Sequence, residues 1–188
     1  MNIEKLGNSR IINILSKIPI MAWDSRLRRW LFNPNKTLQG ANLRAGQTVL
    51  EVGCGSGFFT IPAAQMIGES GRLIAMDPVS SFVDAVKEKS QTAGLKNVEV
   101  VRRDALNSGL EAASVDVVLL FGVVPFPTLP LGKLLPEMHK ILKRNGTLAV
   151  WLFPTTAGVP TTIVKSGLFQ ELGKKNGVYT YVRSNGRE

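Results

Sequence analysis

A chain of 188 residues, 44% of them hydrophobic and 20% charged, is long enough for one globular domain with a full core. No apolar run reaches the ~18–20 residues of a membrane span, and the single cysteine, Cys54, excludes an internal disulfide and a multi-cysteine metal site, so we expect no metal. The net charge of +9 is uneven: residues 1–45 hold eight Lys and Arg against two acidic residues, which leaves +3 for the other 143.

Residues 1–44 are predicted to form a basic, amphipathic helical arm or lid. Trp23 and Trp30 can share one face of a helix while Arg26 and its neighbouring arginines lie elsewhere. This pattern suits a membrane interface, the mouth of an apolar substrate site or a stacked base; it also suits a helix packed on the main domain with solvated arginines. We expect Trp23 to contact substrate.

The opening of the chain does not resemble a cleavable signal peptide. We therefore expect a cytoplasmic protein that associates with a membrane surface through the arm. A basic arm also suits nucleic acid or an acidic partner, and charge alone does not choose among them. We favour a membrane surface over nucleic acid. The sequence does not specify an oligomeric state.

Asn33-Pro34 predicts a cap and the first position of a short helix, which leads into a buried strand over residues 48–52. Glycines follow at positions 53, 55 and 57, and a mostly apolar helix is predicted from Phe58 onward. Glycines reach positive φ without steric cost and let a ligand lie against the backbone, while the start of a helix offers unpaired N–H groups. This strand, turn and helix predict a ligand site.

The pattern Glu51-x-Gly53-x-Gly55-x-Gly57 resembles motif I of the class I S-adenosylmethionine-dependent methyltransferases, with Glu51 at the acidic position. It differs from the dinucleotide fingerprint of dehydrogenases, which would require glycine where Phe58 stands. The resemblance implies that Glu51, Cys54 and the three glycines bind S-adenosylmethionine. It covers roughly residues 45–183 and is nearest to the small enzymes of the ubiquinone and menaquinone type (methyltransferase type 11).

A second strand, predicted at residues 72–76, ends at Asp77, about where doubly wound nucleotide-binding folds place a ribose-binding acid. A carboxylate there can accept hydrogen bonds from two neighbouring hydroxyls. Asp77-Pro78 would otherwise only cap the helix predicted from residue 82. We favour ribose binding by Asp77, with Pro78 beside the cofactor.

A third strand is predicted at residues 98–101, and Asp104 follows it. In the family that this chain resembles, an acid at this position holds the adenine amino group, and the backbone N–H of the next residue, here Ala105, addresses a ring nitrogen. A carboxylate is a suitable partner for an exocyclic amine because the amine is a donor. The alternative for Asp104 is a solvated loop acid.

The run 114–121 predicts a central strand that is covered on both faces and ends at Phe121, which we assign to the cofactor site. The proline-stiffened loop 122–130 follows at the edge where ligands bind in open α/β sheets, so Pro125 and Phe126 are predicted to line the acceptor pocket. A plain proline-rich connection is the alternative. A helix over 131–142, a turn at 143–146, a strand at 147–153 and a closing hairpin complete the chain.

The resemblance implies an α/β fold of the Rossmann-like, doubly wound type. We expect residues 45–188 to form the catalytic domain, a mostly parallel seven-stranded sheet with an antiparallel last strand and helices on both faces. The predicted function is in-line methyl transfer from S-adenosylmethionine to a small, apolar or lipid-like acceptor. An RNA methyltransferase and a non-catalytic S-adenosylmethionine-binding module are the alternatives.

No catalytic residue can be assigned from the sequence. The leaving group of methyl transfer from a sulfonium is a neutral thioether, which needs no acid, and a base is required only if the acceptor keeps its proton at neutral pH. His139, the single histidine, lies at the edge of a predicted amphipathic helix, and we expect it to be a surface or packing residue.

Overall fold

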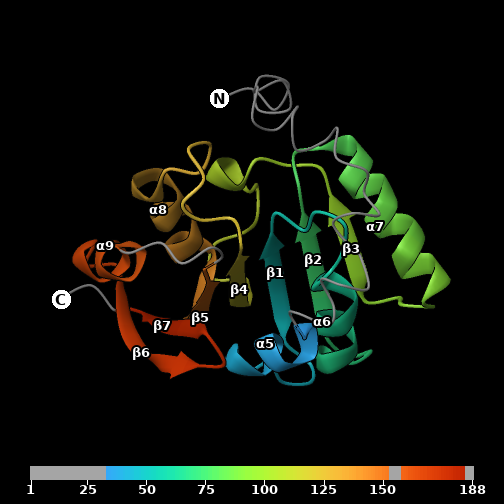
Figure 1. Ribbon diagram of the computed structural model, residues 1–188, viewed down its shortest axis with the longest axis horizontal. Coiled ribbons are helices and arrows are strands. Elements are labelled where there is room, and N and C mark those ends of the chain that lie inside the picture. The colour runs from blue at the N-terminus through green and yellow to red at the C-terminus, as the bar shows by residue number, and fades with distance from the viewer. Residues whose placement is uncertain (1–32, 153–157, 185–188) are drawn as a thin grey trace.

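The computed structural model describes residues 33–152 and 158–184, which form one seven-stranded sheet with helices on both faces (Figure 1). Most of the arm, including Trp23, lies outside the described residues. The strands are β1 (Thr48–Val52), β2 (Arg72–Met76), β3 (Val98–Val101), β4 (Val115–Phe121), β5 (Leu142–Trp151), β6 (Phe169–Lys175) and β7 (Val178–Arg183). The helices are α5 (Pro34–Gly40), α6 (Thr60–Ile67), α7 (Ser80–Thr92), the 3₁₀ turn η1 (Ala105–Asn107), α8 (Leu131–Ile141) and α9 (Val159–Lys165).

The strand order is β3-β2-β1-β4-β5-β7-β6. Neighbouring strands from β3 to β5 are parallel, and β7 is antiparallel to both of its neighbours, β5 and β6. The order reverses at β1, because the chain moves outward to β2 and β3 and then returns to place β4 on the other side of β1. The predicted fold class is confirmed, including the antiparallel last strand.

The central strands bury both faces, which explains their continuous apolar runs. Leu50 and Val118 face a core cluster that includes residues of α8 and α9, while Val49 and Val117 face a second cluster that includes residues of α5 and α6. Because successive side chains of a strand alternate between faces, β1 and β4 supply both clusters. The predicted helices on both faces are confirmed.

Helix α5 begins as the sequence predicts, with the Asn33 side chain accepting a hydrogen bond from the backbone N–H of Lys36 at 3.2 Å and Pro34 in the first position. Leu38 and Ala41 are buried in the core cluster shared with α6. The boundary between arm and catalytic domain at residue 44 stays a prediction. Among helices of the described ranges, none combines the length and apolar character needed to cross a bilayer.

The closing hairpin forms as predicted, with Lys175 opposite Val178 and both turn residues, Asn176 and Gly177, at positive φ. The predicted turn at 143–146 is wrong. Strand β5 already begins at Leu142, and its pairing with β4 jumps from Val115–Leu142 to Val117–Thr147, so that residues 143–146 form a bulge. Pairing with β4 at both ends overrides the local turn preference, and Gly146 does not adopt positive φ.

Candidate functional site at the carboxyl edge of the sheet

The glycine turn after β1 is fixed to the end of β2. The backbone N–H groups of Gly53 and Cys54 both donate to the carbonyl oxygen of Met76, at 2.7 and 3.1 Å, and the N–H of Gly57 donates to the carbonyl of Cys54 at 2.9 Å. All three glycines have positive φ, which side chains with a Cβ adopt at a cost. The turn is therefore a rigid loop beside Asp77.

The three glycines serve different purposes. A Cβ on Gly53 would overlap Cγ1 of Val123, and one on Gly57 would lie 3.2 Å from Cγ2 of Val86. A Cβ on Gly55 would meet no atom within 4 Å. Gly53 and Gly57 thus permit close packing of the turn against the protein, whereas Gly55 faces open space where a ligand can approach the backbone.

Ser56 completes the turn and was not assigned a role from the sequence. Its side chain is buried, and its hydroxyl has no hydrogen-bond partner in the described part of the chain. Its carbonyl accepts a hydrogen bond from Nζ of Lys89 on α7 at 2.8 Å. The contact from Lys89 therefore ties the glycine turn to α7.

Asp77 is 5% exposed and holds two segments at once. Its Oδ2 accepts from the N–H of Gly55 at 3.0 Å, and its Oδ1 accepts from the N–H of Val79 at 2.9 Å, just before α7. The two sequence interpretations of Asp77 are therefore compatible, because the residue closes the turn before the helix and also holds the glycine turn. A carboxylate has about four acceptor positions, so roughly two remain for a ligand.

Burial raises the pKa of Asp77 to about 6, although the hydrogen bonds from Val79 and Gly55 lower it. Glu51 is 3% exposed, and its Oε2 accepts from the hydroxyl of Thr60 at 2.6 Å. Burial raises the pKa of Glu51 to about 8, against the effect of the Thr60 hydrogen bond and aided by the charge of Asp77. Glu51 thus binds the strand to the first residue of α6.

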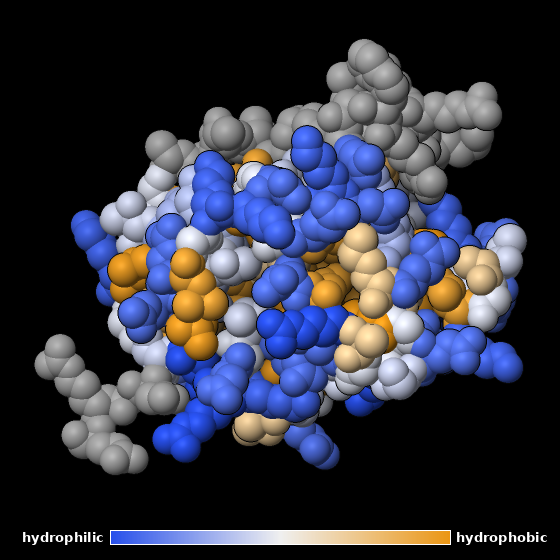
Figure 2. All heavy atoms as spheres, turned by 90° about the horizontal axis from the view of Figure 1, so that it is seen from below, coloured by the Kyte–Doolittle hydropathy of each residue, from blue (hydrophilic) through white to orange (hydrophobic). Residues whose placement is uncertain are grey.

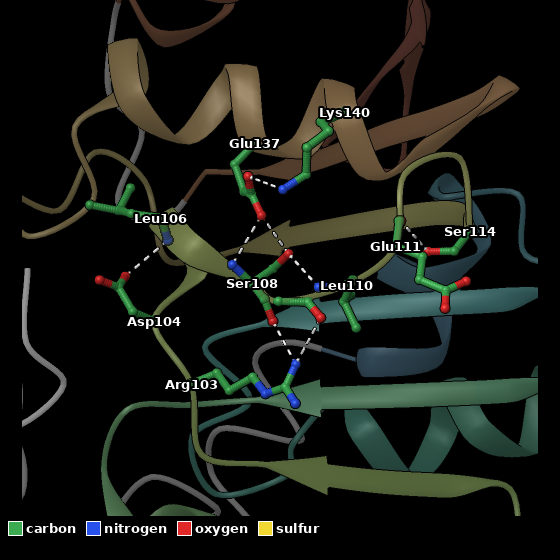
Figure 3. Close-up of polar contacts among 10 residues, drawn as sticks. Arg103, Asp104, Leu106, Ser108, Leu110, Glu111, Ser114, Glu137 and Lys140 are labelled. Atoms are coloured by element: carbon green, nitrogen blue, oxygen red, sulfur yellow. Dashed lines mark hydrogen bonds and ion pairs between the residues drawn. The ribbon is translucent and has the colours of Figure 1, made fainter.

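Asp104 lies at the same edge, because the N–H of Asp77 donates to the carbonyl of Val101 at 3.2 Å and so joins the ends of β2 and β3. Oδ1 of Asp104 accepts a hydrogen bond from the N–H of Leu106 at 2.9 Å and caps η1 (Figure 3). The side chain is 5% exposed, so it is not a solvated loop acid. No described residue donates a hydrogen bond to its other oxygen. Ala105, which follows it, is buried.

Polar contacts with α8 hold the segment after Asp104 in place (Figure 3). Oε1 of Glu137 accepts from the N–H and the hydroxyl of Ser108, at 3.0 and 2.6 Å, while Nζ of Lys140 donates to Oε2 at 2.6 Å. Nη1 of Arg103 donates to the carbonyls of Ser108 and Gly109. Asp104 therefore sits on a braced segment, which favours precise recognition of a ligand.

Other predicted cofactor residues are used inside the protein. Cys54 packs against Ala75 and Val86, and burial raises the pKa of its thiol well above the usual range. Phe121 is buried at the end of β4, with its ring edge-on to Phe59 at a centroid distance of 5.0 Å. The carbonyl of Pro78 accepts from Nε of Arg102 at 3.1 Å. In each of these three contacts, the residue is bound to another part of the protein, and the contact leaves no polar group free for a ligand.

The loop after β4 is anchored to β5 at its start and contains an internal turn near its end. The N–H of Gly122 donates to the carbonyl of Trp151 at 2.9 Å, and the N–H of Leu129 donates to the carbonyl of Phe126 at 2.9 Å. Its second residue, Val123, packs against Gly53 in the glycine turn. Pro125 is exposed and Phe126 is half-buried. The loop predicted to line the acceptor pocket thus begins in contact with the predicted cofactor turn.

Four residues at this edge were not predicted from the sequence: Thr60, Ser56, Lys89 and Val123. Thr60 stands at the start of α6, where its link to Glu51 could have been predicted from the strand, turn and helix alone. Lys89 and Val123 carry no local signal, since each reaches the turn from a distant segment. His139 lies on α8 with its ring edge-on to Phe169 at 5.7 Å, a packing contact. Within residues 33–152 and 158–184, no group of His, Cys, Asp and Glu could hold a metal.

The residues at this edge suit a nucleoside. Asp77 retains acceptor capacity for a diol, Asp104 retains an oxygen for an amine, and Gly55 faces open space where a ligand can approach the backbone. A nucleoside has neutral hydroxyl and amino groups that can donate hydrogen bonds to the carboxyl groups of Asp77 and Asp104. A phosphate group would match them less well, because it is an anion and an acceptor itself. The geometry therefore favours a nucleoside without phosphate.

A sequence profile described as "methyltransferase domain" matches residues 49–146. The chain is 30% identical over 135 residues to the demethylmenaquinone methyltransferase of Oceanobacillus iheyensis, covering 71% of this chain and 56% of that protein. It is 32% identical over 106 residues to the protein of the same name from Staphylococcus epidermidis, covering 56% of this chain and 42% of that one. The chain thus spans about half the length of the curated relatives it matches.

Among solved structures, a SAM-dependent methyltransferase from Aquifex aeolicus superposes with a TM-score of 0.69 and 26% identity, covering 87% of this chain and 95% of the other. A S-adenosylmethionine-dependent methyltransferase from Methanococcus maripaludis, described as putative, gives a TM-score of 0.70 at 16% identity, covering 86% and 90%. The second likeness bears on the fold alone.

Proposed function

The chain belongs to the class I S-adenosylmethionine-dependent methyltransferases, and from this premise we propose that it transfers a methyl group, by in-line displacement, to a small, apolar or lipid-like acceptor. The observation that carries the cofactor half of the proposal is the link between Gly55 and Asp77, which joins an open backbone turn to a buried carboxyl group with spare acceptor positions.

In the proposed site, Asp77 accepts hydrogen bonds from the ribose hydroxyls and Asp104 accepts one from the adenine amino group. The turn at Gly55 contacts the rest of the ligand. S-adenosylmethionine supplies, when bound, a methyl group on a sulfonium whose leaving group is a neutral thioether. The protein therefore has no leaving group to protonate, and its main contribution is to orient the two reactants.

Two observations support an apolar acceptor. The two relatives described above are named demethylmenaquinone methyltransferases, which suggests an isoprenoid quinol or a similar molecule for this chain. The loop from Gly122 to Pro130 is rich in apolar residues and starts against the glycine turn at Val123. We propose that Pro125 and Phe126 line the acceptor site, together with Trp23 of the arm.

The test is transfer of a tritiated methyl group from S-adenosylmethionine by the full chain to a panel of isoprenoid quinol extracts in detergent. We expect label in the lipid fraction. Phe126→Ala and Trp23→Ala should each reduce turnover and leave S-adenosylhomocysteine affinity unchanged, whereas Val164→Ala, at an exposed position on α9, should alter neither. Failure to label any lipid across the panel would refute the proposed acceptor class.

The net charge of +9 supports RNA as a second acceptor class. A basic binding surface predicts an RNA affinity that falls steeply with salt, so undetectable or salt-independent binding would exclude this alternative. A chain that binds S-adenosylhomocysteine but labels neither lipid nor RNA would be a non-catalytic binding module. A chain that binds NAD instead would contradict the cofactor assignment itself.

The arm supports a second part of the proposal, which is association with a membrane surface. Its Trp and Arg residues match an interfacial amphipathic helix, and a lipid-like acceptor would reach the site from such a surface. Co-sedimentation of the full chain with anionic lipid vesicles tests it. We expect binding that weakens when Trp23 and Trp30 are replaced with alanine, and equal binding by parent and variant would refute the role of the arm.

A further inference from the structure

A cavity of about 470 Å³ lies at the amino edge of the sheet, at the opposite ends of the strands from Asp77 and Asp104. It is bounded by the segment after α5, the start of β4, the bulge of β5 and the hairpin β6–β7. Figure 2 views this end of the molecule, where hydrophilic side chains surround a hollow with apolar residues beneath. Its volume is within the range of small-molecule sites.

The cavity carries excess positive charge. Arg44 and Arg144 line it, both are exposed, and neither guanidinium has a hydrogen bond or ion pair to any residue that the structure describes. Its one acidic lining residue, Asp116, is already neutralised, because both carboxylate oxygens lie 2.8 Å from Nζ of Lys143. Oδ2 also accepts from the N–H of Thr48 at 2.8 Å. Two cationic groups therefore remain for a ligand.

Both arginines stand on fixed backbone. Arg144 belongs to the bulge of β5, and the strand pairs with β4 on both sides of it, at Leu142 and Thr147. The backbone N–H of Arg44 donates to Oε1 of Gln47 at 2.7 Å, which closes a turn before β1. A bulge re-aims side chains away from the regular ladder, and here it places Arg144 at the cavity.

The cavity also has an apolar side. Leu172 on β6 lines it and is 60% exposed, and the buried Ala41 also lines it. An exposed leucine beside two unpaired guanidinium groups suits a ligand that has an anionic head and an apolar part. Guanidinium groups bind phosphate oxygens in a bidentate manner, which matches a phosphate monoester or a diphosphate.

We propose that this cavity is a second ligand site, for a small molecule that carries a phosphate or diphosphate group and an apolar portion. Its concave shape favours a small ligand over nucleic acid, which would need an extended row of cations. Strand β1 spans five residues, or roughly 16 Å at ~3.3 Å each, so the site is separated from the carboxyl edge. The inference is independent of the proposed methyl transfer.

The test is calorimetric titration of the full chain with two probes, inorganic pyrophosphate and hexyl phosphate, with and without saturating S-adenosylhomocysteine. We expect both probes to bind in either case. The double variant R44Q/R144Q should weaken the binding of both probes at least about tenfold, because each of its two substitutions removes a charge-assisted contact. K96Q/K165Q, which removes the same charge at two exposed positions outside the cavity, should change binding less than about twofold.

A second pair of variants separates the apolar side from folding effects. Leu172→Ala should weaken hexyl phosphate and leave pyrophosphate unchanged, while Val164→Ala, a similar truncation at an exposed position on α9, should leave both unaltered. The proposal is overturned if neither probe binds the parent chain, or if both double variants lose binding equally. It is also overturned if an RNA oligonucleotide, but neither probe, binds through Arg44 and Arg144.

Discussion

Asp77→Asn is the substitution that isolates the proposed contact between the sheet edge and a ribose. The change keeps the side chain nearly the same size but removes its charge and one acceptor oxygen. In the parent, both oxygens already accept backbone N–H groups, from Gly55 and Val79. The variant can satisfy only one of them, and its amide faces the other with a donor. At most one acceptor position, on a neutral oxygen, then remains for two ribose hydroxyls.

The size of the effect follows from these lost hydrogen bonds. A hydrogen bond to a charged group contributes ~1.5–3 kcal/mol, so losing two of them should cost about 3 kcal/mol or more, which is roughly a hundredfold in Kd. The variant should also be moderately less stable, because one backbone N–H loses its acceptor. Loss of the charge offsets part of this cost, since burial raises the pKa of Asp77 to about 6 and the fold therefore favours an uncharged side chain at this position.

The assay is isothermal titration with S-adenosylhomocysteine at pH 7.5, accompanied by thermal melting of each variant. Asp84→Asn is the matched control, because Asp84 is exposed on α7 and the substitution makes the same charge change. We expect roughly hundredfold weaker binding by Asp77→Asn, parental affinity for Asp84→Asn, and a melting temperature of Asp77→Asn that is lower than the parent's but well above the assay temperature. An Asp77→Asn protein that binds within threefold of the parent would refute the ribose assignment.

Three further predictions concern the same edge. Since the pKa of Asp77 is about 6 in the free protein, S-adenosylhomocysteine affinity should be level above pH 7 and fall up to about tenfold per pH unit below 6, a dependence that titrations of Asp77→Asn should lack. Glu51 has its pKa raised from 4.5 to about 8, so its stabilising contribution is complete below pH 4.5 and is lost as pH rises through 8. Melting of Glu51→Gln should therefore vary less than the parent over this window, and an unchanged slope would contradict the burial argument. Gly53→Ala should lower the melting temperature, because the added Cβ would overlap the side chain of Val123. Gly55→Ala should cost only ~1–2 kcal/mol of backbone strain and yet weaken S-adenosylhomocysteine binding at least about tenfold. If Gly55→Ala left the binding affinity unchanged, Gly55 would not face the ligand.

The fold could be predicted because its signals are local and repeated. β4 is a continuous apolar run, as expected for a strand buried on both faces, and three glycines mark the turn after β1. The turn predicted at residues 143–146 failed because strand pairing is a long-range constraint. Local preference at Asn145-Gly146 was outweighed by the ladder with β4 on either side.

The candidate site could be predicted only in part. The sequence presented ribose binding and helix capping by Asp77 as alternatives, although one carboxylate has enough acceptor positions for both. The contact from Lys89 to Ser56 and the cavity at the amino edge join segments far apart in the chain, so no spacing rule finds them. The acceptor side leaves little signature, because methyl transfer from a sulfonium depends more on orientation than on an acid or a metal.

The most direct test of the central claim is a crystal structure of the chain with S-adenosylhomocysteine. The account predicts that both ribose hydroxyl oxygens lie within hydrogen-bond distance of the Asp77 carboxylate, that the adenine amino group lies beside Asp104, and that the ligand passes over Gly55. A ligand bound elsewhere, or a nucleoside that leaves Asp77 bonded only to Gly55 and Val79, would contradict it.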